Sequence, residues 1–413
     1  MNRRNFCLSA AAYAASARAR ALTAASSPPT APDSNQPLIT AGEIAHIDRG
    51  RILRAANEFL AQPPITITAY SSPRSHGGRH DYFSEGDYWF PDPKNPGGPY
   101  IRRDGYSDPA NFNNHREALI RLSLQVPALT AAWLVTRDRR YARHASLHLR
   151  AWFLDPATRM NPSLDYAQAI WGVTPGRGTG VIDTLHLIEV SRAVRHLEQA
   201  SVLAATESGG VRDWFAQYLD WMRTSKNGKE EEAARNNHAS CWVAQVAAFA
   251  ALTGNQDAMA LCRERFKNNL MPDQLAPNGS FPLELARTKP YSYSLFDLDV
   301  LAIVCQIASI PESKVGDSTG DLWQFSLPNG NRYKNAVEFM FPFIQDKSKW
   351  PYAHDVEYFD DLPNRQPSLL FAGLAYREPK YIALWRTLPA DPKTAEIIRN
   401  FPVRQPLLWV TPV

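Results

Sequence analysis

The segment AAWLVTRDRRYARHASLHL, residues 131 to 149, sets the pattern on which the fold prediction depends. An apolar helical run ends, a few polar residues turn the chain, and a second amphipathic helix begins. The same order recurs in AAFAALTGNQDAMALCRERF, residues 247 to 266, and in FAGLAYREPKYIALWRTL, residues 371 to 388. Each helix pair buries only one face by itself, so such pairs stack sideways. We therefore predict antiparallel helix hairpins in a loose quasi-repeat without a strict period.

The apolar spacing from about residue 116 onward is helical and requires no strands. Between residues 181 and 197, apolar side chains recur at intervals of three and four and their sums, which lays one stripe along a helix. A stack of helix hairpins closes into a ring around a central cleft. We predict an all-α fold, an (α/α) toroid or incomplete barrel, as a single domain over residues 41 to 413.

Residues 71 to 115 interrupt this pattern. The stretch is dense in Gly, Pro and aromatic residues, which excludes a helix hairpin. Loops of this length in a compact domain are usually functional or disordered. Its aromatic side chains between Tyr82 and Phe90 argue against disorder. We expect a long, ordered N-terminal loop over the cleft, acting either as a structural cover or as a wall for a substrate.

The first 30 residues are typical of an export signal of the twin-arginine type. Arg3 and Arg4 precede a weakly apolar, Ala-rich run from Cys7 to Ala17, and a linker over residues 31 to 40 follows. Elsewhere the chain has no stretch of 18 or more apolar residues. The sequence therefore predicts a periplasmic or secreted protein with no membrane association after the signal is removed.

The composition is that of a globular protein with a large core, since 44% of the residues are hydrophobic and 21% are charged. The formal net charge of +4 is not concentrated in a basic block, so a nucleic-acid partner is not expected. An acidic polymer is compatible with this charge. Beyond the signal, Cys241, Cys262 and Cys305 lie in apolar helical patterns. Their odd number argues against disulfides, and we expect them to be buried.

Two segments carry the chemistry. RNNHASCW, residues 235 to 242, places Asn237 and His238 in front of a helical run, and Arg287 and Tyr293 follow some fifty residues later. Asn237 offers N–H donors and Arg287 a forked cationic pair, which suit the negative charge that grows on a sugar carboxylate when its neighbouring carbon loses a proton. The structural alternative is that Arg287 pairs with Glu284 and that Tyr293 packs with its hydroxyl capped.

These segments, together with FSEGDYWFPDP, YAQAI, GRGTGVIDT and WPYAHD, resemble the alginate-lyase-like superfamily of toroidal polysaccharide lyases over about residues 70 to 376. The resemblance implies β-elimination of a uronate polymer, alginate or glucuronan, that leaves a 4,5-unsaturated uronate end. It implies that Asn237 helps to neutralise the sugar carboxylate, that His238 and Arg287 assist, and that Tyr293 moves protons.

Two proton-transfer schemes remain open. In β-linked mannuronate or glucuronate the proton on carbon 5 and the oxygen on carbon 4 lie on the same side, so Tyr293 can serve as base and then as acid. That scheme requires the tyrosine pKa, ordinarily about 10, to fall under the influence of Arg287 and His238. In guluronate the two atoms lie on opposite sides, which fits His238 as base and Tyr293 as acid.

Further side chains are candidates for sugar subsites. They are Tyr82, Trp89, Tyr166, Gln168, Arg177 and Tyr291. The glycine-rich stretch at residues 172 to 184 has no strand before it and no Lys-Ser/Thr after it, so a phosphate loop is disfavoured. We interpret the acidic cluster at residues 350 to 363 as solvated surface rather than a cation site. The NNH motif offers one good metal ligand, so neither a metal nor another cofactor is predicted.

Two other functions are alternatives to the lyase. An inverting glycoside hydrolase on a similar ring needs two opposed carboxyl groups roughly 6.5 to 9.5 Å apart. Candidate carboxylates exist, for example Glu85, Asp87 and Asp165, but they do not pair with the NNH and tyrosine segments. A non-catalytic protein that binds acidic polysaccharides would not require Tyr293. The sequence leaves the identity of the polymer and the oligomeric state open.

Overall fold

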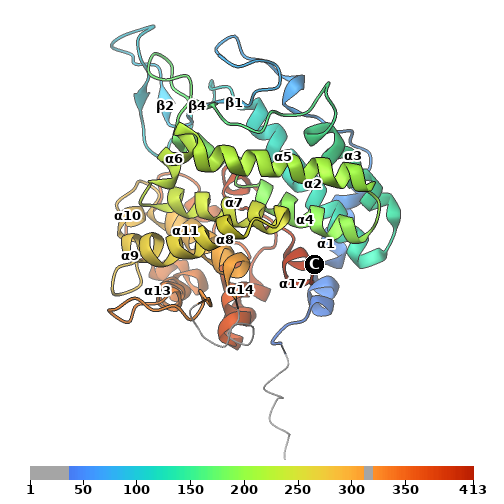
Figure 1. Cartoon of the computed structure of the whole chain (residues 1–413). Helices are drawn as coiled ribbons and strands as arrows, with labels where there is room; N and C mark the ends of the chain where they lie inside the picture. The colour runs from blue at the N-terminus through green and yellow to red at the C-terminus, as the bar shows by residue number, and fades with distance from the viewer. Residues whose placement is uncertain (1–36, 311–319) are drawn as a thin grey trace, which may run out of the picture. The chain divides into compact units, whose positions relative to one another are not determined.

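Long helices dominate the part of the chain that the structure describes, residues 37–310 and 320–413 of a computed structural model (Figure 1). The predicted export signal and most of the predicted linker lie outside the described residues. The longer helices are α1 (Ala41–Phe59), α2 (Asn114–Thr136), α3 (Arg139–Phe153), α4 (Leu187–Gln199), α5 (Ala205–Thr224), α7 (Asn237–Thr253), α8 (Gln256–Arg265), α11 (Pro290–Ala308), α13 (Tyr333–Gln345), α14 (Pro367–Tyr376) and α15 (Pro379–Thr387).

Shorter helical pieces connect these elements. Those of α type are α6 (Lys226–Glu232), α9 (Met271–Gln274), α10 (Pro282–Leu285), α16 (Ala395–Arg399) and α17 (Pro406–Val410). The 3₁₀ turns are η1 (Ile67–Ala69), η2 (Gly178–Thr184), η4 (Lys347–Lys349) and η5 (Phe359–Asp361), and η3 (Phe266–Leu270) is a π-helical turn.

The three predicted hairpins are confirmed, and all three turn in the same way. Helices α2, α7 and α14 end with a left-handed residue: Arg137 at φ 60°, Gly254 at φ 77° and Arg377 at φ 54°. Each of these residues donates its backbone N–H to a carbonyl of the last helical turn. The partner helices α3, α8 and α15 each begin two residues later. A short polar sequence is therefore sufficient to reverse the chain.

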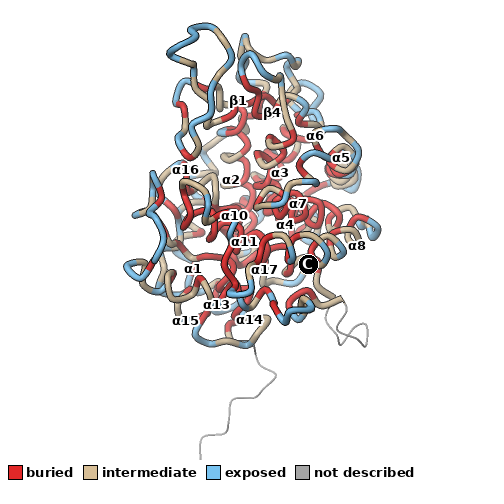
Figure 2. Tube along the Cα trace, turned by 90° about the vertical axis from the view of Figure 1, so that its left-hand side faces the viewer, coloured by how far each residue is buried: buried red, intermediate tan, exposed pale blue. Residues whose placement is uncertain are grey.

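The hairpins divide into buried inner helices and exposed outer ones. In α7, 14 of 17 residues are buried, whereas in α8 only two of ten are. Consecutive inner helices pack against each other in the order α2, α4, α7, α11 and α14. A helix that is apolar all round must be covered on every side, and Figure 2 shows α4, α7 and α11 as largely buried. The predicted all-α (α/α) fold is confirmed.

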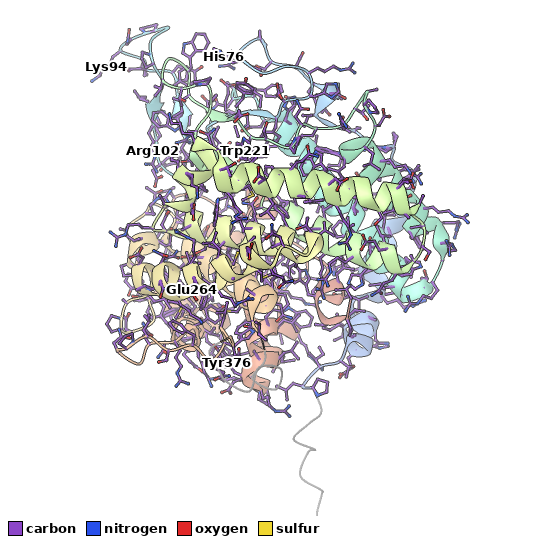
Figure 3. The ribbon with its side chains drawn as sticks, in the orientation of Figure 1. His76, Lys94, Arg102, Trp221, Glu264 and Tyr376 are labelled. Carbon is purple, nitrogen blue, oxygen red and sulfur yellow. The ribbon has the colours of Figure 1, made fainter. Side chains whose placement is uncertain are left out.

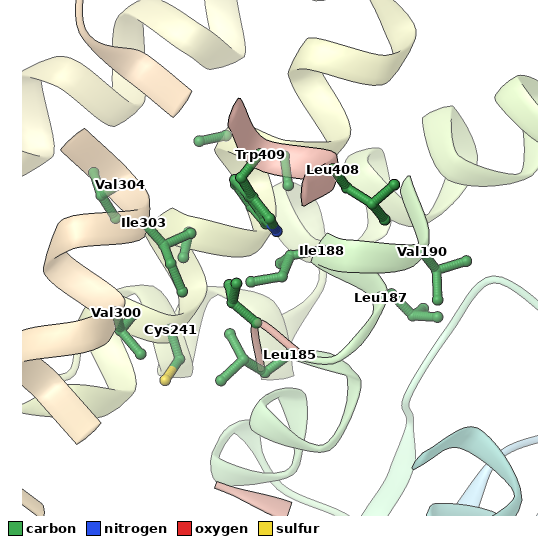
Figure 4. Packing of buried hydrophobic residues seen from close by; sticks show 14 of the residues in the cluster. Leu185, Leu187, Ile188, Val190, Cys241, Val300, Ile303, Val304, Leu408 and Trp409 are labelled. Carbon is green, nitrogen blue, oxygen red and sulfur yellow. The ribbon is translucent and has the colours of Figure 1, made fainter. Parts of the chain in front are cut away.

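The core between α4, α7, α11 and α17 is apolar. Figure 4 shows Leu185 and Ile188 near Cys241, Ile303 and Trp409. The three cysteines are free and buried, as predicted. The buried helices α2 and α11 are long and apolar enough to pass a composition test for membrane spans. However, 72% and 89% of their apolar windows are buried inside the protein, so we assign them to the core.

In the part of the chain that the structure describes, four short strands stand over one end of the helices (Figure 1). In the N-terminal loop, β2 (Trp89–Phe90) pairs with β3 (Ile101–Arg102) in antiparallel fashion. β1 (Phe83–Glu85) pairs in parallel with β4 (Tyr166–Ala169). The expectation that no strand follows residue 116 is wrong for β4. The segment around β4 is rich in Pro and Gly, and its strand partner β1 lies more than 80 residues away in the sequence. The loop is thus ordered, as expected.

Candidate active site

A cavity of about 270 Å³ lies between the N-terminal loop and the starts of α7 and α11. Asn237, His238, Arg287 and Tyr293 all line it, so the structure brings the four predicted catalytic residues together. Three of them belong to first helical turns: Asn237 and His238 begin α7, and Tyr293 is the fourth residue of α11. Both helices therefore direct their positive ends towards the cavity, which favours an acidic ligand.

Buried carboxylates from other segments hold both helix starts. Glu284 accepts the backbone N–H of Asn237 at 2.9 Å. Asp355 accepts the N–H groups of Tyr291 and Ser292 at 2.8 and 2.9 Å. The first N–H groups of a helix have no partner within it, and neither helix has a side-chain cap of its own. The orientation of the two first turns that carry predicted catalytic residues thus depends on contacts that are distant in sequence.

His238 is paired with a carboxylate that the sequence interpretation missed. The Nδ1 atom of His238 lies 2.6 Å from Oε1 of Glu231, whose side chain is only 3% exposed. Because a carboxylate only accepts hydrogen bonds, Nδ1 carries the proton towards Glu231, and Nε2 remains as the second ring nitrogen. In the neutral ring Nε2 is an acceptor, which is the form that a general base requires.

Arg287 makes its forked interaction within the protein. Its Nε and Nη2 atoms donate to the two oxygens of Asp104 at 3.1 and 2.8 Å, whereas Glu284 lies 3.9 Å away. Burial alone would raise the pKa of the Asp104 carboxyl, but the guanidinium holds it well below its usual value. The guanidinium carbon lies 4.3 Å from the centre of the Tyr293 ring. Asp104 therefore fixes Arg287 against the phenol.

Tyr293 is hydrogen-bonded to a second phenol. Its hydroxyl lies 2.7 Å from that of Tyr88, in the loop over the cavity. Burial raises the pKa of Tyr293, and Tyr88 raises it further, against a smaller lowering by Arg287. The expectation that neighbouring cations would lower this pKa is wrong for the free protein, because Tyr293 is only 7% exposed and desolvation outweighs the cation. The phenol is neutral and suited to donate a proton.

Three of the predicted subsite residues also line the cavity: Trp89, Gln168 and Arg177. Gln168 accepts from Nη2 of Arg177 at 2.8 Å, and the guanidinium lies 5.8 Å from the centre of a Trp89 ring. Burial lowers the pKa of Arg177. Among the described residues, Arg177 forms no salt bridge. These contacts therefore hold its guanidinium at the cavity wall without an ion-pair partner.

The other three predicted subsite residues lie outside the cavity lining. Tyr82 is fully buried and donates to Asp183 at 3.1 Å. Tyr291 is fully buried and donates to the carbonyl of Phe343 at 3.0 Å. Tyr166 packs on Gly77, where an added Cβ would lie 2.6 Å from its ring. In this structure these rings support the walls of the cavity rather than face its interior.

The floor of the cavity is a network of charges. Arg116 donates to Asp183 at 3.1 Å and also to Asp87, which Arg399 contacts from the C-terminal segment. Burial opposes ionisation of Asp87, but the two guanidinium groups lower its pKa. Both cavity carboxylates are therefore engaged by arginines. Asp87, with its lowered pKa, does not resemble the acid with a raised pKa that a hydrolase needs.

The interpretation of the acidic cluster at residues 350 to 363 as solvated surface is confirmed for Asp360 and Asp361, which are exposed, but it is wrong for Asp355, which is buried and serves the fold. Asp355 holds the start of α11, and Glu357 lies 3.2 Å from the ammonium group of Lys289. Among residues 37–310 and 320–413, no group of three or more His, Cys, Asp or Glu side chains is arranged to hold a metal ion.

The comparisons with known proteins agree with this geometry. The model of the family described as Alginate lyase matches residues 66–350. The chain belongs to the alginate lyase family. It is thus a polysaccharide lyase, and the expected resemblance is confirmed. A crystal structure of an alginate lyase from Bacteroides ovatus matches with a TM-score of 0.75 and 30% identity, over 91% of this chain and 99% of that one.

A more distant lyase shares the fold alone. Alginate lyase A1-III from Sphingomonas species A1 matches with a TM-score of 0.50 and 13% identity, over 82% of this chain and 88% of that one. No curated protein matches the chain by sequence. The two alternative functions, hydrolase and non-catalytic binding protein, are set aside by membership of this family of lyases.

Sequence reasoning missed several residues of this lyase site: Tyr88, Asp104, Glu231 and Arg399. Tyr88, Asp104 and Arg399 meet their partners across the fold, and the separation between Tyr88 and Tyr293 is 205 residues. Only Glu231 is near its partner in the sequence, seven residues before His238, but it lies at the end of α6 whereas His238 lies at the start of α7. The acidic run at residues 230–232 gave no reason to choose it over its neighbours.

Proposed function

We propose that this protein cleaves alginate by β-elimination and leaves an unsaturated uronate at the new end. One observation carries the proposal: an amide, an imidazole, a guanidinium and a phenol from two helix starts and one turn line a single cavity. The family and the name of the Bacteroides ovatus relative support alginate rather than glucuronan as the substrate.

The first requirement of this reaction is to stabilise charge on the uronate carboxylate. Asn237 offers neutral amide donors, and Arg287 offers the Nη1 atom that its pairing with Asp104 leaves over. The positive ends of α7 and α11 act in the same direction. Donors that are already oriented need no rearrangement when charge moves onto the carboxylate in the transition state, which is where stabilisation accelerates the reaction.

The second requirement is to move two protons. His238, oriented by Glu231, takes the proton from carbon 5, and neutral Tyr293 donates to the leaving oxygen at carbon 4. A separate base and acid fit guluronate linkages. For mannuronate, Tyr293 must first lose its proton, which the bound substrate would have to promote against the effect of burial. We therefore propose that guluronate linkages depend on both residues and mannuronate linkages chiefly on Tyr293.

The experiment is to follow ultraviolet-absorbing products from guluronate-rich alginate, mannuronate-rich alginate and glucuronan. Wild-type protein should form them from alginate. Tyr293→Phe should abolish turnover on both alginates, and His238→Ala should affect guluronate-rich material more. Cleavage without ultraviolet-absorbing ends would refute β-elimination. Full activity of Tyr293→Phe would remove this residue from the mechanism.

We also propose that the protein is exported by the twin-arginine route, on the strength of its first 30 residues. Replacement of Arg3 and Arg4 by lysine should retain the protein in the cytoplasm, as cell fractionation would show. Export of the double variant at the normal level would contradict the proposal.

A further inference from the structure

A second hollow lies on the other side of the β1–β4 strand pair. It has a volume of about 520 Å³, and we call it the outer hollow. Its lining includes Arg74, Phe83, Glu85, residues 97–99 and residues 169–175. Trp171 is 46% exposed there, which is unusual for so large an apolar side chain. Neither the catalytic chemistry nor the packing of the core makes use of this ring.

Trp171 sits on a turn that is fixed before any ligand arrives. The backbone groups of Ile170 and Thr174 exchange hydrogen bonds of 2.9 and 3.0 Å, which close the turn. Gly172 has φ +72°, and a Cβ atom there would lie 2.8 Å from Cα of Pro99. The N–H of Tyr100 donates to the carbonyl of Trp171 at 3.0 Å. The two loops thus pack closely against each other. Because the backbone around Trp171 is already ordered, binding a ligand to its ring costs little conformational entropy.

The outer hollow and the catalytic cavity lie on either side of one strand, β4, and share no lining residue. In β4, Gln168 lines the catalytic cavity, and the next residue, Ala169, lines the outer hollow. Trp171 follows two residues later. The extended backbone advances roughly 3.3 Å per residue, so the Cα atoms of Gln168 and Trp171 are at most about 10 Å apart. A polymer that leaves the cavity over this strand pair meets Trp171 next.

The chemistry of the outer hollow suits a sugar acid. A tryptophan ring offers a flat apolar face with a polar N–H at its edge, which matches the apolar face of a pyranose ring. Arg74 is held by Glu85 at 3.1 Å, yet its side chain remains 31% exposed while that of Glu85 is only 4% exposed. His76, which also lines the hollow, stands on the outer loops (Figure 3). Arg74 and His76 therefore bring N–H donors for hydroxyl and carboxylate oxygens into the same hollow as the ring.

We propose that the outer hollow is a distal binding subsite for the alginate chain, with Trp171 as the platform on which one sugar ring stacks. The proposal rests on the proposed function, because it takes the same polymer as ligand. It adds that the protein distinguishes long chains from short ones: a chain that extends past β4 gains the contact with Trp171, and an oligosaccharide that only fills the catalytic cavity does not.

The test compares Trp171→Ala with wild-type protein on polymeric alginate and on alginate trisaccharide. We expect KM for the polymer to rise by roughly two- to tenfold, with kcat unchanged and with no change in either constant for the trisaccharide. Trp171→Phe, which keeps an aromatic ring, should recover part of the loss. Leu147→Ala removes a comparably exposed apolar side chain, 45% exposed, from α3 and serves as the matched control.

Equal effects of Trp171→Ala on both substrates, or no effect on either, would overturn the proposal. Retention of each variant in gels that contain alginate measures binding without turnover. If wild-type protein produced no unsaturated products, the proposed function would fail. The gel assay would still show whether Trp171 contributes to alginate binding. Loss of retention in Trp171→Ala would support the subsite, and unchanged retention would overturn it.

Discussion

The buried carboxyl of Asp299 gives a quantitative test of the electrostatics in the core. Asp299 lies in α11, is 2% exposed, and accepts the backbone N–H of Ser368 at the start of α14 at 3.1 Å. Burial raises its pKa from 3.8 to about 7. The folded protein therefore binds this proton more tightly than the unfolded chain does. The contribution to stability is fully present below pH 3.8 and is lost as the pH rises to about 7.

The magnitude follows from this difference in pKa. Since one pKa unit corresponds to about 1.4 kcal/mol, the rise from 3.8 to about 7 costs the folded protein about 4 kcal/mol above pH 7. Asp299→Asn keeps an oxygen that can accept the Ser368 N–H but has no charge to desolvate. We expect the variant to gain stability over the wild type as the pH rises, by about 2 to 3 kcal/mol between pH 5 and pH 8.

The assay is urea unfolding followed by tryptophan fluorescence at both pH values. Asp220→Asn changes an exposed aspartate of α5 in the same way and should show no such gain. A constant difference between Asp299→Asn and the wild type at pH 5 and pH 8 would refute the argument, because it would mean that the carboxyl titrates alike in the folded and unfolded chain.

Three further predictions concern the site. Asn237→Ala should lower kcat by about 100- to 1,000-fold and weaken alginate binding far less; equal losses in initial-rate kinetics and in binding would show that the amide only holds the substrate. Glu231→Gln should lower kcat by about 10- to 100-fold, and ¹⁵N NMR of His238 should show that the ring no longer keeps a single tautomer; an unchanged spectrum would contradict the role of this carboxylate. Tyr88→Phe removes a group that raises the pKa of Tyr293, so the alkaline limb of the profile of kcat against pH should move to lower pH. A move to higher pH would show that Tyr88 lowers the pKa of Tyr293 instead.

Local patterns in the sequence were sufficient for the helices. The turn after α7 is encoded by Gly254, which adopts a left-handed conformation freely, whereas Arg137 and Arg377 adopt it after α2 and α14, where the polar residues around them marked the turn. The inner helices are encoded by continuous apolar character. In contrast, β4 and β1 form only because two distant segments meet, and their few residues carry no alternating pattern of their own.

The candidate catalytic groups could be predicted because their segments resemble toroidal polysaccharide lyases and their residue types suit the chemistry that the resemblance implies. Asn237, His238, Arg287 and Tyr293 stand in one cavity as that chemistry requires. Their supporting partners were not accessible, because any of several acidic residues satisfies the local pattern equally well. Only the fold selects Asp104 for Arg287. The fold also raises the pKa of Tyr293, which was expected to fall, because the burial of this side chain depends on the assembled protein.

The carboxylates at the starts of α7 and α11 tie catalysis to completion of folding. Glu284 and Asp355 reach these helices from 47 and 64 residues away, so a partly formed chain has the reactive side chains but lacks the anchors that aim them. During refolding, activity should therefore appear only after the contacts of Glu284 and Asp355 with the two helix starts have formed. A fragment that spans only the segments of the four candidate catalytic residues would be a poor starting point for a smaller catalyst.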